Sequence, residues 1–326
     1  RDLHKAIRRA ASDVYKRQRF LLDIFSIKWY IVHVKKTEED KTMKKFIAIV
    51  MSLVLIASVA MLAGCGKKDD VKAAKVIGID LTNENYAFGV DKAQPELLEK
   101  TNAFIDKILS NGTFDEICSR YSSGGEPVLV KSAAKDSSKD QLVVATNAAF
   151  EPFEYTVGDS YAGIDMEIAK LLADELGKEL VIDNMDFDAV CLSVGQHKCD
   201  IAMAGLTVNP DREASVTFSK TYYKASQRVV VKGDDTTFDD CKTADDVLKK
   251  LQSFDASVKI GYQNGTTGGM YINNESDYAS NNLKVTGKGY KNGSLAIQDL
   301  INGNINYVII DSAPADSIVK SINEVA

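Results

Sequence analysis

The chain has 326 residues, of which 45% are apolar and 26% charged, a balance typical of globular proteins. Residues 1–64 hold 13 Lys/Arg and 6 Asp/Glu, so the remaining residues, with 27 basic and 40 acidic side chains, carry a formal charge of −13. This excess of acidic groups argues against a nucleic-acid partner. His197 is the one histidine beyond residue 64, which argues against histidine triads and histidine-rich metal sites, and we expect no cofactor.

Residues 1–42 contain no methionine and match no domain pattern. Asp13–Gln18 looks like translated sequencing-adapter DNA, and we interpret the whole segment as upstream sequence that is not part of the protein. The alternative is a membrane segment over Phe20–Val34, but Asp23 and Lys28 interrupt its apolar run.

Met43 begins a pattern of two lysines, an apolar run over Phe46–Leu62 and then Ala63-Gly64-Cys65. A basic start, an apolar centre and a small-residue end predict a signal peptide over 43–64, with a transmembrane helix as the alternative. The Leu-Ala-Gly-Cys ending resembles a lipobox. We therefore expect a lipid on Cys65, a polar tether over 65–74 and an extracytoplasmic protein anchored to the cell membrane.

Residues 75–121 predict a β-branched strand at Lys75–Ile79, a second extended piece at Tyr86–Val90 and two helices. The first helix begins at Pro95 and ends before Gly112, with its apolar residues on one stripe. Thr113–Glu116 has the spacing of a capping box that opens the second helix. Residues 122–140 are rich in Ser, Lys and Gly and predict a linker.

Strands alternate with helices over 141–226 and again over 227–326, which predicts two α/β lobes with mostly parallel sheets. The expected strands are Leu142–Ala145, Leu180–Ile182, Cys199–Ala204, Gln227–Val231, Val258–Tyr262 and Tyr307–Ile310. The expected helices are Gly163–Gly177, Asp188–Gly195, Ala244–Phe254, Ser294–Asn302 and Pro314–Glu324.

Candidate binding chemistry gathers in Asp200–Tyr223, after a short apolar strand. Gly205 lets a ligand approach bare backbone, Thr207 offers a hydroxyl that donates and accepts, and Arg212 offers a planar fork for a carboxylate. Together they predict half of a site for a small zwitterion. A solvated surface arginine is the alternative for Arg212.

The other half is expected from the turn Gly265-Thr266-Thr267-Gly268, from Asp311 after a strand, and from the aromatic pair Phe150 and Phe187. The turn is expected to open a helix, whose first amides suit an anion. The alternatives are an ordinary loop, a helix N-cap at Asp311 and two core aromatics.

Several stretches of the chain resemble the bacterial extracellular solute-binding proteins of family 3, the polar amino-acid receptors of ABC importers. The matching stretches are Tyr86–Ile117, Ala145–Tyr155, Tyr161–Ala169, Asp200–Tyr223, Gly261–Gly268 and Tyr307–Pro314. The resemblance implies a two-lobe, periplasmic-binding-protein-like (type II) fold of mixed, mostly parallel sheets flanked by helices. Two hinge strands would join the lobes, and we expect them at Tyr86–Val90 and Lys224–Arg228.

The resemblance also implies a receptor, and not an enzyme, that holds a free polar amino acid between its lobes and delivers it to the transmembrane subunits of an ABC permease. The carboxylate would meet Arg212 and the N–H groups of Thr207 and Thr267, in the turn that includes Thr266. The ammonium would meet Asp311, the Gly205 carbonyl and the Thr207 hydroxyl. Phe150 and Phe187 would enclose the side chain.

Asn147 stands where relatives that prefer cationic side chains often carry an acid, so its amide favours a polar neutral ligand over lysine or arginine, although Glu151 lies nearby. Gln263 is expected to add a contact from the other lobe. Among the cysteines no C-x-x-C pair occurs, which argues against structural zinc. Cys191 and Cys199 are close enough in sequence for a disulfide, with free thiols as the alternative.

The order of the segments differs from that of the family, in which stretches like 75–121 come last. Here they precede the strand at Leu142. We expect a circular permutation, since termini often lie close together at the surface. A monomer is expected, and a domain-swapped oligomer in which 75–121 completes a neighbour is the alternative. Rival functions are an enzyme on the same fold, similar to cyclohexadienyl dehydratase, and a ligand-sensing module.

Overall fold

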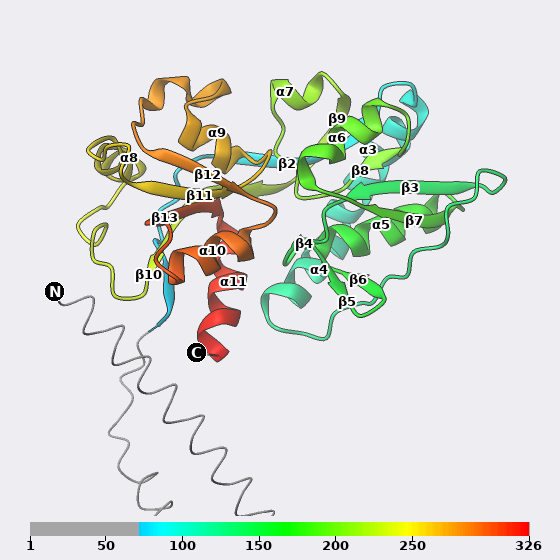
Figure 1. Cartoon of the computed structure of the whole chain (residues 1–326). Helices are drawn as coiled ribbons and strands as arrows, with labels where there is room; N and C mark the ends of the chain where they lie inside the picture. Colours follow the sequence, from blue (N-terminus) through cyan, green and yellow to red (C-terminus); the bar gives the residue numbers. More distant parts are fainter. Residues whose placement is uncertain (1–71, 326) are drawn as a thin grey trace, which may run out of the picture. The chain divides into compact units, whose positions relative to one another are not determined.

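The computed structural model describes residues 72–325, whose helices and strands are labelled in Figure 1. The upstream segment 1–42, the signal peptide 43–64 and Cys65 lie outside the described residues. Within the described part, no helix combines the length and the apolar character needed to cross a membrane.

Lobe 1, residues 84–226, is built on a five-stranded sheet of order β7-β3-β8-β2-β9. Parallel pairs join β3 to β7 and β8, whereas β2 runs antiparallel to β8 and β9. The strands are β2 (Glu84–Asp91), β3 (Gln141–Thr146), β7 (Glu179–Asn184), β8 (Ile201–Ala202) and β9 (Val216–Ala225), and a small sheet adds β4 (Ala149–Phe150), β5 (Glu154–Val157) and β6 (Ser160–Ala162).

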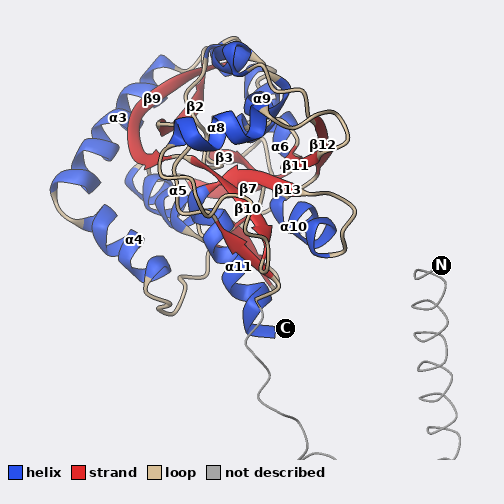
Figure 2. Cartoon of the chain, turned by 90° about the vertical axis from the view of Figure 1, so that its left-hand side faces the viewer, coloured by secondary structure: helices blue, strands red, loops and turns tan. Residues whose placement is uncertain are grey.

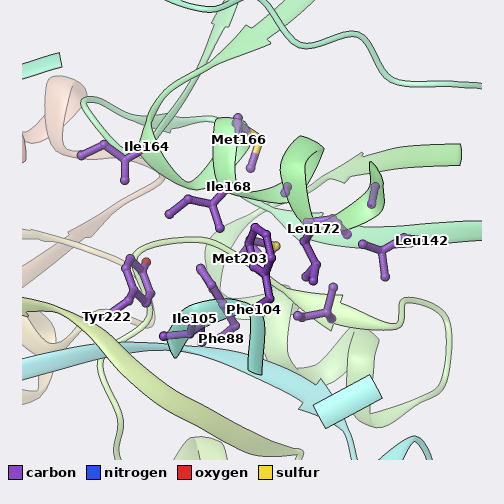
Figure 3. Packing of buried hydrophobic residues seen from close by; sticks show 14 of the residues in the cluster. Phe88, Phe104, Ile105, Leu142, Ile164, Met166, Ile168, Leu172, Met203 and Tyr222 are labelled. Atoms are coloured by element: carbon purple, nitrogen blue, oxygen red, sulfur yellow. The ribbon is translucent and has the colours of Figure 1, made fainter. Parts of the chain in front are cut away.

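Helices cover the lobe 1 sheet, and α3 follows the outside of the curved strand β9 (Figure 2). They are α3 (Pro95–Ser110), α4 (Thr113–Ser122), α5 (Ile164–Glu175), α6 (Phe187–Gly195) and the single turn α7 (Pro210–Glu213). Figure 3 shows the core between them, where Phe88 of β2, Phe104 of α3, Ile168 of α5 and Met203 come together. The burial of each such side chain contributes about 1.5–3 kcal/mol to the stability of the folded state.

Lobe 2, residues 72–83 and 227–325, is built on a second five-stranded sheet of order β1-β10-β13-β11-β12. Its strands are β1 (Ala74–Val76), β10 (Gln227–Lys232), β11 (Lys259–Gln263), β12 (Thr286–Tyr290) and β13 (Tyr307–Asp311). Its helices are α8 (Ala244–Gln252), α9 (Thr267–Asn273), the 3₁₀ segment η1 (Ser276–Asn281), α10 (Gly293–Ile301) and α11 (Ser312–Val325). The two-lobe α/β fold that the resemblance implied is confirmed, although each five-stranded sheet holds as many antiparallel as parallel pairings.

The N-terminal segment takes part in both sheets. Strand β1 pairs with β10 in lobe 2, from Ala74 opposite Lys232 to Val76 opposite Val230. Strand β2 then lies between β8 and β9 in lobe 1, with Gly89 opposite both Ala202 and Phe218. Residues far apart in sequence therefore form one continuous sheet in each lobe.

The chain passes between the lobes at two places. One is Ser226, between β9 and β10. The other is residues 82–84, because the Leu81 N–H still bonds to Gln227 of lobe 2 whereas β2 begins at Glu84. The expected hinge at Tyr86–Val90 is therefore wrong: those residues pair inside the lobe 1 sheet.

Three other local expectations need correction. The strand expected at Cys199–Ala204 is only Ile201–Ala202, and the chain turns at Gly205, whose φ is +54°. The capping box at Thr113 is wrong: Gly112 holds the N-cap position in a left-handed conformation. Part of the expected linker packs on lobe 1, since Val130 and Tyr161 exchange two backbone hydrogen bonds of 2.8 Å.

Candidate functional site between the lobes

Arg212 is placed by its own short helix. Asn209, ahead of Pro210, caps α7 by accepting the Arg212 N–H at 2.8 Å. The Arg212 side chain is 8% exposed, and its guanidinium donates to the carbonyls of Thr207 at 2.7 Å and of Gly265 in lobe 2 at 3.0 Å. The solvated-surface alternative for Arg212 therefore does not hold, since two of its five N–H groups bind backbone oxygens of opposite lobes.

The aromatic residues predicted to form a pair have separate neighbours. Phe187, at the start of α6, lies under the guanidinium carbon of Arg212, 5.2 Å from its ring centroid. Phe150 is buried beside Gly205, where an added Cβ would lie 2.8 Å from its ring. Phe150 thus covers the open face of Gly205. The Gly205 N–H donates to Asp165 Oδ2 at 2.9 Å.

Asp311 ends β13 in lobe 2 and is 4% exposed. Its Oδ1 accepts the Tyr86 hydroxyl at 2.6 Å. Burial, with the nearby Glu84 carboxylate second, raises the pKa of Asp311 to about 7, against the opposing effects of Tyr86, Gln227 and Arg212. Near neutral pH, this carboxyl group is poised between its two protonation states.

Thr207 does not present a free hydroxyl. Its Oγ1 donates to Glu84 Oε2 at 2.6 Å, and Thr207 itself is buried. Glu84 also accepts from Thr82 at 2.6 Å and, more weakly, from Gln227 Nε2 at 3.4 Å. Glu84 thereby links the Thr207 side chain to Thr82 and Gln227, which lie at the two places where the chain passes between the lobes.

A further contact between the lobes joins Gln263 and Asn147. Gln263 Nε2 donates to Asn147 Oδ1 at 2.9 Å, and Asn147 Nδ2 donates to the Met185 carbonyl at 2.6 Å. Gln263 is 1% exposed, and its Oε1 has no hydrogen-bond partner among the described residues. A buried acceptor without a donor is costly, so this oxygen suits a donor on a bound molecule.

The predicted turn 265–268 does open a helix, α9. Thr266 is its N-cap residue, and the Thr266 hydroxyl donates to the Gln263 carbonyl at 2.7 Å. Thr267, the first residue of α9, is 4% exposed. Gly265 has a φ of +73°, and an added Cβ would lie 3.1 Å from Cα of Asp188 in lobe 1, so glycine permits this close approach of the lobes.

Two groups of opposite charge, Arg212 in lobe 1 and Asp311 in lobe 2, are buried where the lobes meet. The Arg212 guanidinium is near enough to lower the pKa of Asp311, yet the two form no ion pair within the described part of the chain. A cavity of about 190 Å³ adjoins Arg212, with walls from lobe 1 and from Gly265 and Met270 of lobe 2. The geometry offers one cationic and one acidic group at the contact of the two lobes.

Several residues in this region were missed by sequence reasoning. Glu84 and Tyr86 lie on one face of β2. The sequence signal that could have indicated Glu84 is an acidic residue at the beginning of an otherwise mostly apolar strand. Asp165 lies in the family-like stretch Tyr161–Ala169, is fully buried, and accepts hydrogen bonds from the Tyr222 hydroxyl at 2.7 Å and from the Gly205 N–H at 2.9 Å. Burial raises the pKa of Asp165 to about 7.

Within residues 72–325, no group of three or more His, Cys, Asp or Glu side chains is arranged to hold a metal ion. Cys191 and Cys199 are present as separate thiols, with Cys199 buried 3.7 Å from Asp183.

Comparison with known proteins gives the chain a family. The model of the "Bacterial extracellular solute-binding proteins, family 3" matches residues 142–312. The arginine-binding extracellular protein ArtP of Bacillus subtilis is 36% identical over 102 residues, which cover 31% of this chain and 40% of that protein. ABC transporter arginine-binding protein 1 of Escherichia coli is 29% identical over 188 residues, 57% of this chain and 69% of that protein.

Among solved structures, an ancestral arginine-binding protein bound to arginine is 31% identical, and the match covers 56% of this chain and 75% of that one with a TM-score of 0.48. The matched part of this chain thus spans less than half of the Bacillus relative and about two thirds of the Escherichia coli one. On the family match, which takes in more than half of its residues, the chain belongs to the bacterial extracellular solute-binding proteins of family 3.

Proposed function

We propose that this protein is the receptor of an ABC importer and binds one free polar amino acid between its lobes. Arg212 would hold the carboxylate in its planar fork, and Asp311 would hold the ammonium. Thr207 Oγ1 and the Gly205 carbonyl would accept further N–H groups, Thr267 would donate its N–H, and Phe150 and Phe187 would flank the side chain.

The observation that carries this proposal is that Arg212 and Asp311, one in each lobe, form no ion pair with any residue that the structure describes. Both are more than nine-tenths buried, and buried charges in proteins are ordinarily paired or neutralised. A zwitterion supplies both missing partners at once, whereas an uncharged ligand supplies neither. Two relatives of the chain are named arginine-binding proteins, which supports an amino acid as the ligand class.

Specificity for the side chain would come from Asn147 and Gln263. Because the Asn147 amide is already bonded to Gln263 and Met185, Gln263 Oε1 is the acceptor left at this contact. A side chain that ends in N–H groups fits it, either the neutral amide favoured by Asn147 or the guanidinium of the relatives' ligand.

Closure of the lobes would couple binding to transport. Arg212–Gly265 and Asn147–Gln263 are contacts between lobes, so an amino acid that adds to them stabilises the closed state and shifts the population toward it. The transmembrane subunits of the permease would then recognise and bind the closed receptor. A lipid on Cys65 would keep it at the outer surface of the cell membrane.

The order of segments is best explained by circular permutation. The proposal is supported by β1 and β2, which fill one place in each sheet although they precede β3 in the chain. In the alternative, 75–121 would complete a neighbouring chain. Light scattering coupled to size exclusion distinguishes the two: a monomer that binds one amino acid favours permutation, and a dimer that exchanges subunits favours the swap.

A thermal-shift screen against the twenty amino acids tests the proposed function. We expect a concentration-dependent rise in melting temperature with one or a few polar amino acids. Arg212→Ala should weaken binding about 30-fold or more, whereas Lys220→Ala, which removes an exposed positive charge that pairs with Asp106 of α3, should not. Turnover of prephenate or arogenate would instead favour the dehydratase-like enzyme, and a response to no amino acid would reject the receptor.

A further inference from the structure

Glu84 is a buried carboxylate for which the proposed function has no role. Its side chain sits where the chain passes from lobe 2 into lobe 1 and is 3% exposed. It accepts hydrogen bonds from Thr82 and Thr207, each at 2.6 Å, and from Gln227 at 3.4 Å. These donors offset the cost of burying its charge.

The bond to Glu84 fixes the direction of the Thr207 hydroxyl hydrogen. An ionised carboxylate only accepts, so Thr207 must donate to it and keeps its own lone pairs for another partner. Tyr86, two residues further along on the same face of β2, acts similarly at Asp311: its hydroxyl donates to Oδ1, and the carboxylate keeps lone pairs that can accept further bonds. Both β2 residues thus orient groups of the neighbouring site.

The polar atoms left open at this end of the site all accept hydrogen bonds. They are Thr207 Oγ1, the lone pairs of the Asp311 carboxylate that Tyr86 and Gln227 do not fill, and Gln227 Oε1, which is fully buried and has no partner among the described residues. An ammonium group has three donors and no acceptor. A hydroxyl group has one donor and brings lone pairs that would face these oxygens.

We propose that Glu84 is a positioning residue that makes this end of the site select an ammonium group over a hydroxyl group. It does so by holding Thr207 as an acceptor and by adding a second negative charge beside Asp311. The inference rests on the proposed function and extends it: the receptor should bind 2-amino acids and discriminate against 2-hydroxy acids with the same side chain.

A purely structural role for Glu84 makes a different prediction. Through Thr82 and Gln227 the carboxylate also links the two passages between the lobes. If that were its whole role, its loss would weaken every ligand by the same factor, because closure would become harder regardless of what is bound.

Calorimetric titration of the full-length protein separates the two roles. The probes are L-arginine and L-glutamine, each with its 2-hydroxy analogue. Glu84→Gln keeps the shape and removes the charge, so it should weaken the two amino acids about tenfold or more and the hydroxy acids less than about threefold. Thr82→Val, which disturbs the passage but leaves Glu84 and Thr207 in contact, should weaken amino and hydroxy acids equally.

A second pair of variants keeps the test decisive if Glu84→Gln does not fold, as judged by circular dichroism. Thr207→Ser keeps the hydroxyl and should keep the discrimination, whereas Thr207→Val removes it and should lose the discrimination. Equal losses of affinity for amino and hydroxy acids in Glu84→Gln or Thr207→Val would overturn the role of Glu84 but would not contradict the proposed receptor function. A wild-type protein that binds neither amino acid would reject the proposed function, and this inference with it.

Discussion

The Tyr86 hydroxyl donates a 2.6 Å hydrogen bond to Asp311 Oδ1, from β2 in lobe 1 to β13 in lobe 2 and across 225 residues of sequence. Burial, with the charge of Asp311 second, raises the pKa of Tyr86 well above its usual range, so the phenol stays a donor. This bond links the N-terminal segment to the predicted ammonium end of the site.

Replacement of Tyr86 by Phe should leave a buried carboxylate with one donor fewer. We expect a loss of about 1.5–3 kcal/mol in the free energy of unfolding at pH 8, because a hydrogen bond to a charged group is lost. Urea denaturation measures this loss. Tyr223→Phe is the matched control, since Tyr223 stacks on Tyr86 at 5.7 Å and its hydroxyl has no bond recorded to the described residues. Equal losses in both variants would contradict the role of the Tyr86–Asp311 bond.

Amino-acid affinity should depend on pH through Asp311. With a pKa raised to about 7, the carboxyl of the empty protein is mostly protonated in mild acid, and an ammonium ligand must displace that proton. The dissociation constant should therefore rise about tenfold for each pH unit well below 7, as measured by calorimetry. The charged and titratable groups that interact electrostatically with Asp311 are Glu84, Tyr86, Arg212, Glu154 and Tyr278. An affinity unchanged between about pH 8 and pH 5 would rule out Asp311 as the ammonium partner.

Glu154 should tolerate replacement by the neutral glutamine. It is fully buried, neither carboxylate oxygen has a partner in the described part of the chain, and burial raises its pKa well above the usual range, with Asp165 and Asp311 adding to the effect. A group whose folded pKa is raised stabilises the fold at low pH and loses that contribution as pH rises through the folded pKa.

Glu154→Gln should accordingly change the unfolding free energy by less than about 1 kcal/mol at about pH 4, where glutamate is still largely protonated in the unfolded chain, and the variant should become more stable than the wild type as pH rises above that value. Denaturation at a series of pH values measures the difference between the two proteins. A Gln variant that becomes relatively weaker with rising pH would mean that Glu154 is ionised and paired in the folded protein.

Gly265→Ala should weaken closure of the lobes. The change strains a backbone with a φ of +73° and also places a Cβ 3.1 Å from Asp188 of the other lobe. Gly124→Ala is the matched control, because Gly124 has the same φ of +73° and nothing within 4 Å of an added Cβ.

Both glycine variants should lose about 1 kcal/mol or more in stability, but only Gly265→Ala should lose amino-acid affinity, by about tenfold. Thermal unfolding and calorimetry provide the two measurements. Undiminished affinity in Gly265→Ala would show that the contact with α6 is not used when ligand binds.

Much of the fold followed from local patterns. The apolar stripe between Pro95 and Gly112 predicted α3, because Leu97, Phe104, Ile105 and Ile108 recur at helical spacing and are buried on one face. Burial of Arg212 could not be deduced in this way. The short helix that aims its side chain is decided by the Asn209 cap, and its lobe 2 partner, the Gly265 carbonyl, lies 53 residues away.

The expectations that were wrong depended on contacts between distant segments. Residues 122–140 have the composition of a linker, yet Val130 is 2% exposed because the strand edge at Tyr161 gives its backbone a partner. The hinge was expected at Tyr86–Val90 because strand periodicity does not reveal at which residue a strand leaves one sheet for another. Glu84 and Tyr86 were missed for the same reason, since their partners Thr207 and Asp311 lie more than 100 residues away.

A crystal structure of the protein grown with L-glutamine or L-arginine, whichever gives the larger thermal shift, tests the binding of one zwitterion by both lobes most directly. The expected density shows a single amino acid with its carboxylate on Arg212 and its ammonium on Asp311, enclosed by residues of both lobes. An amino acid bound elsewhere, or one that contacts a single lobe and leaves either Arg212 or Asp311 without it, would contradict the proposed site.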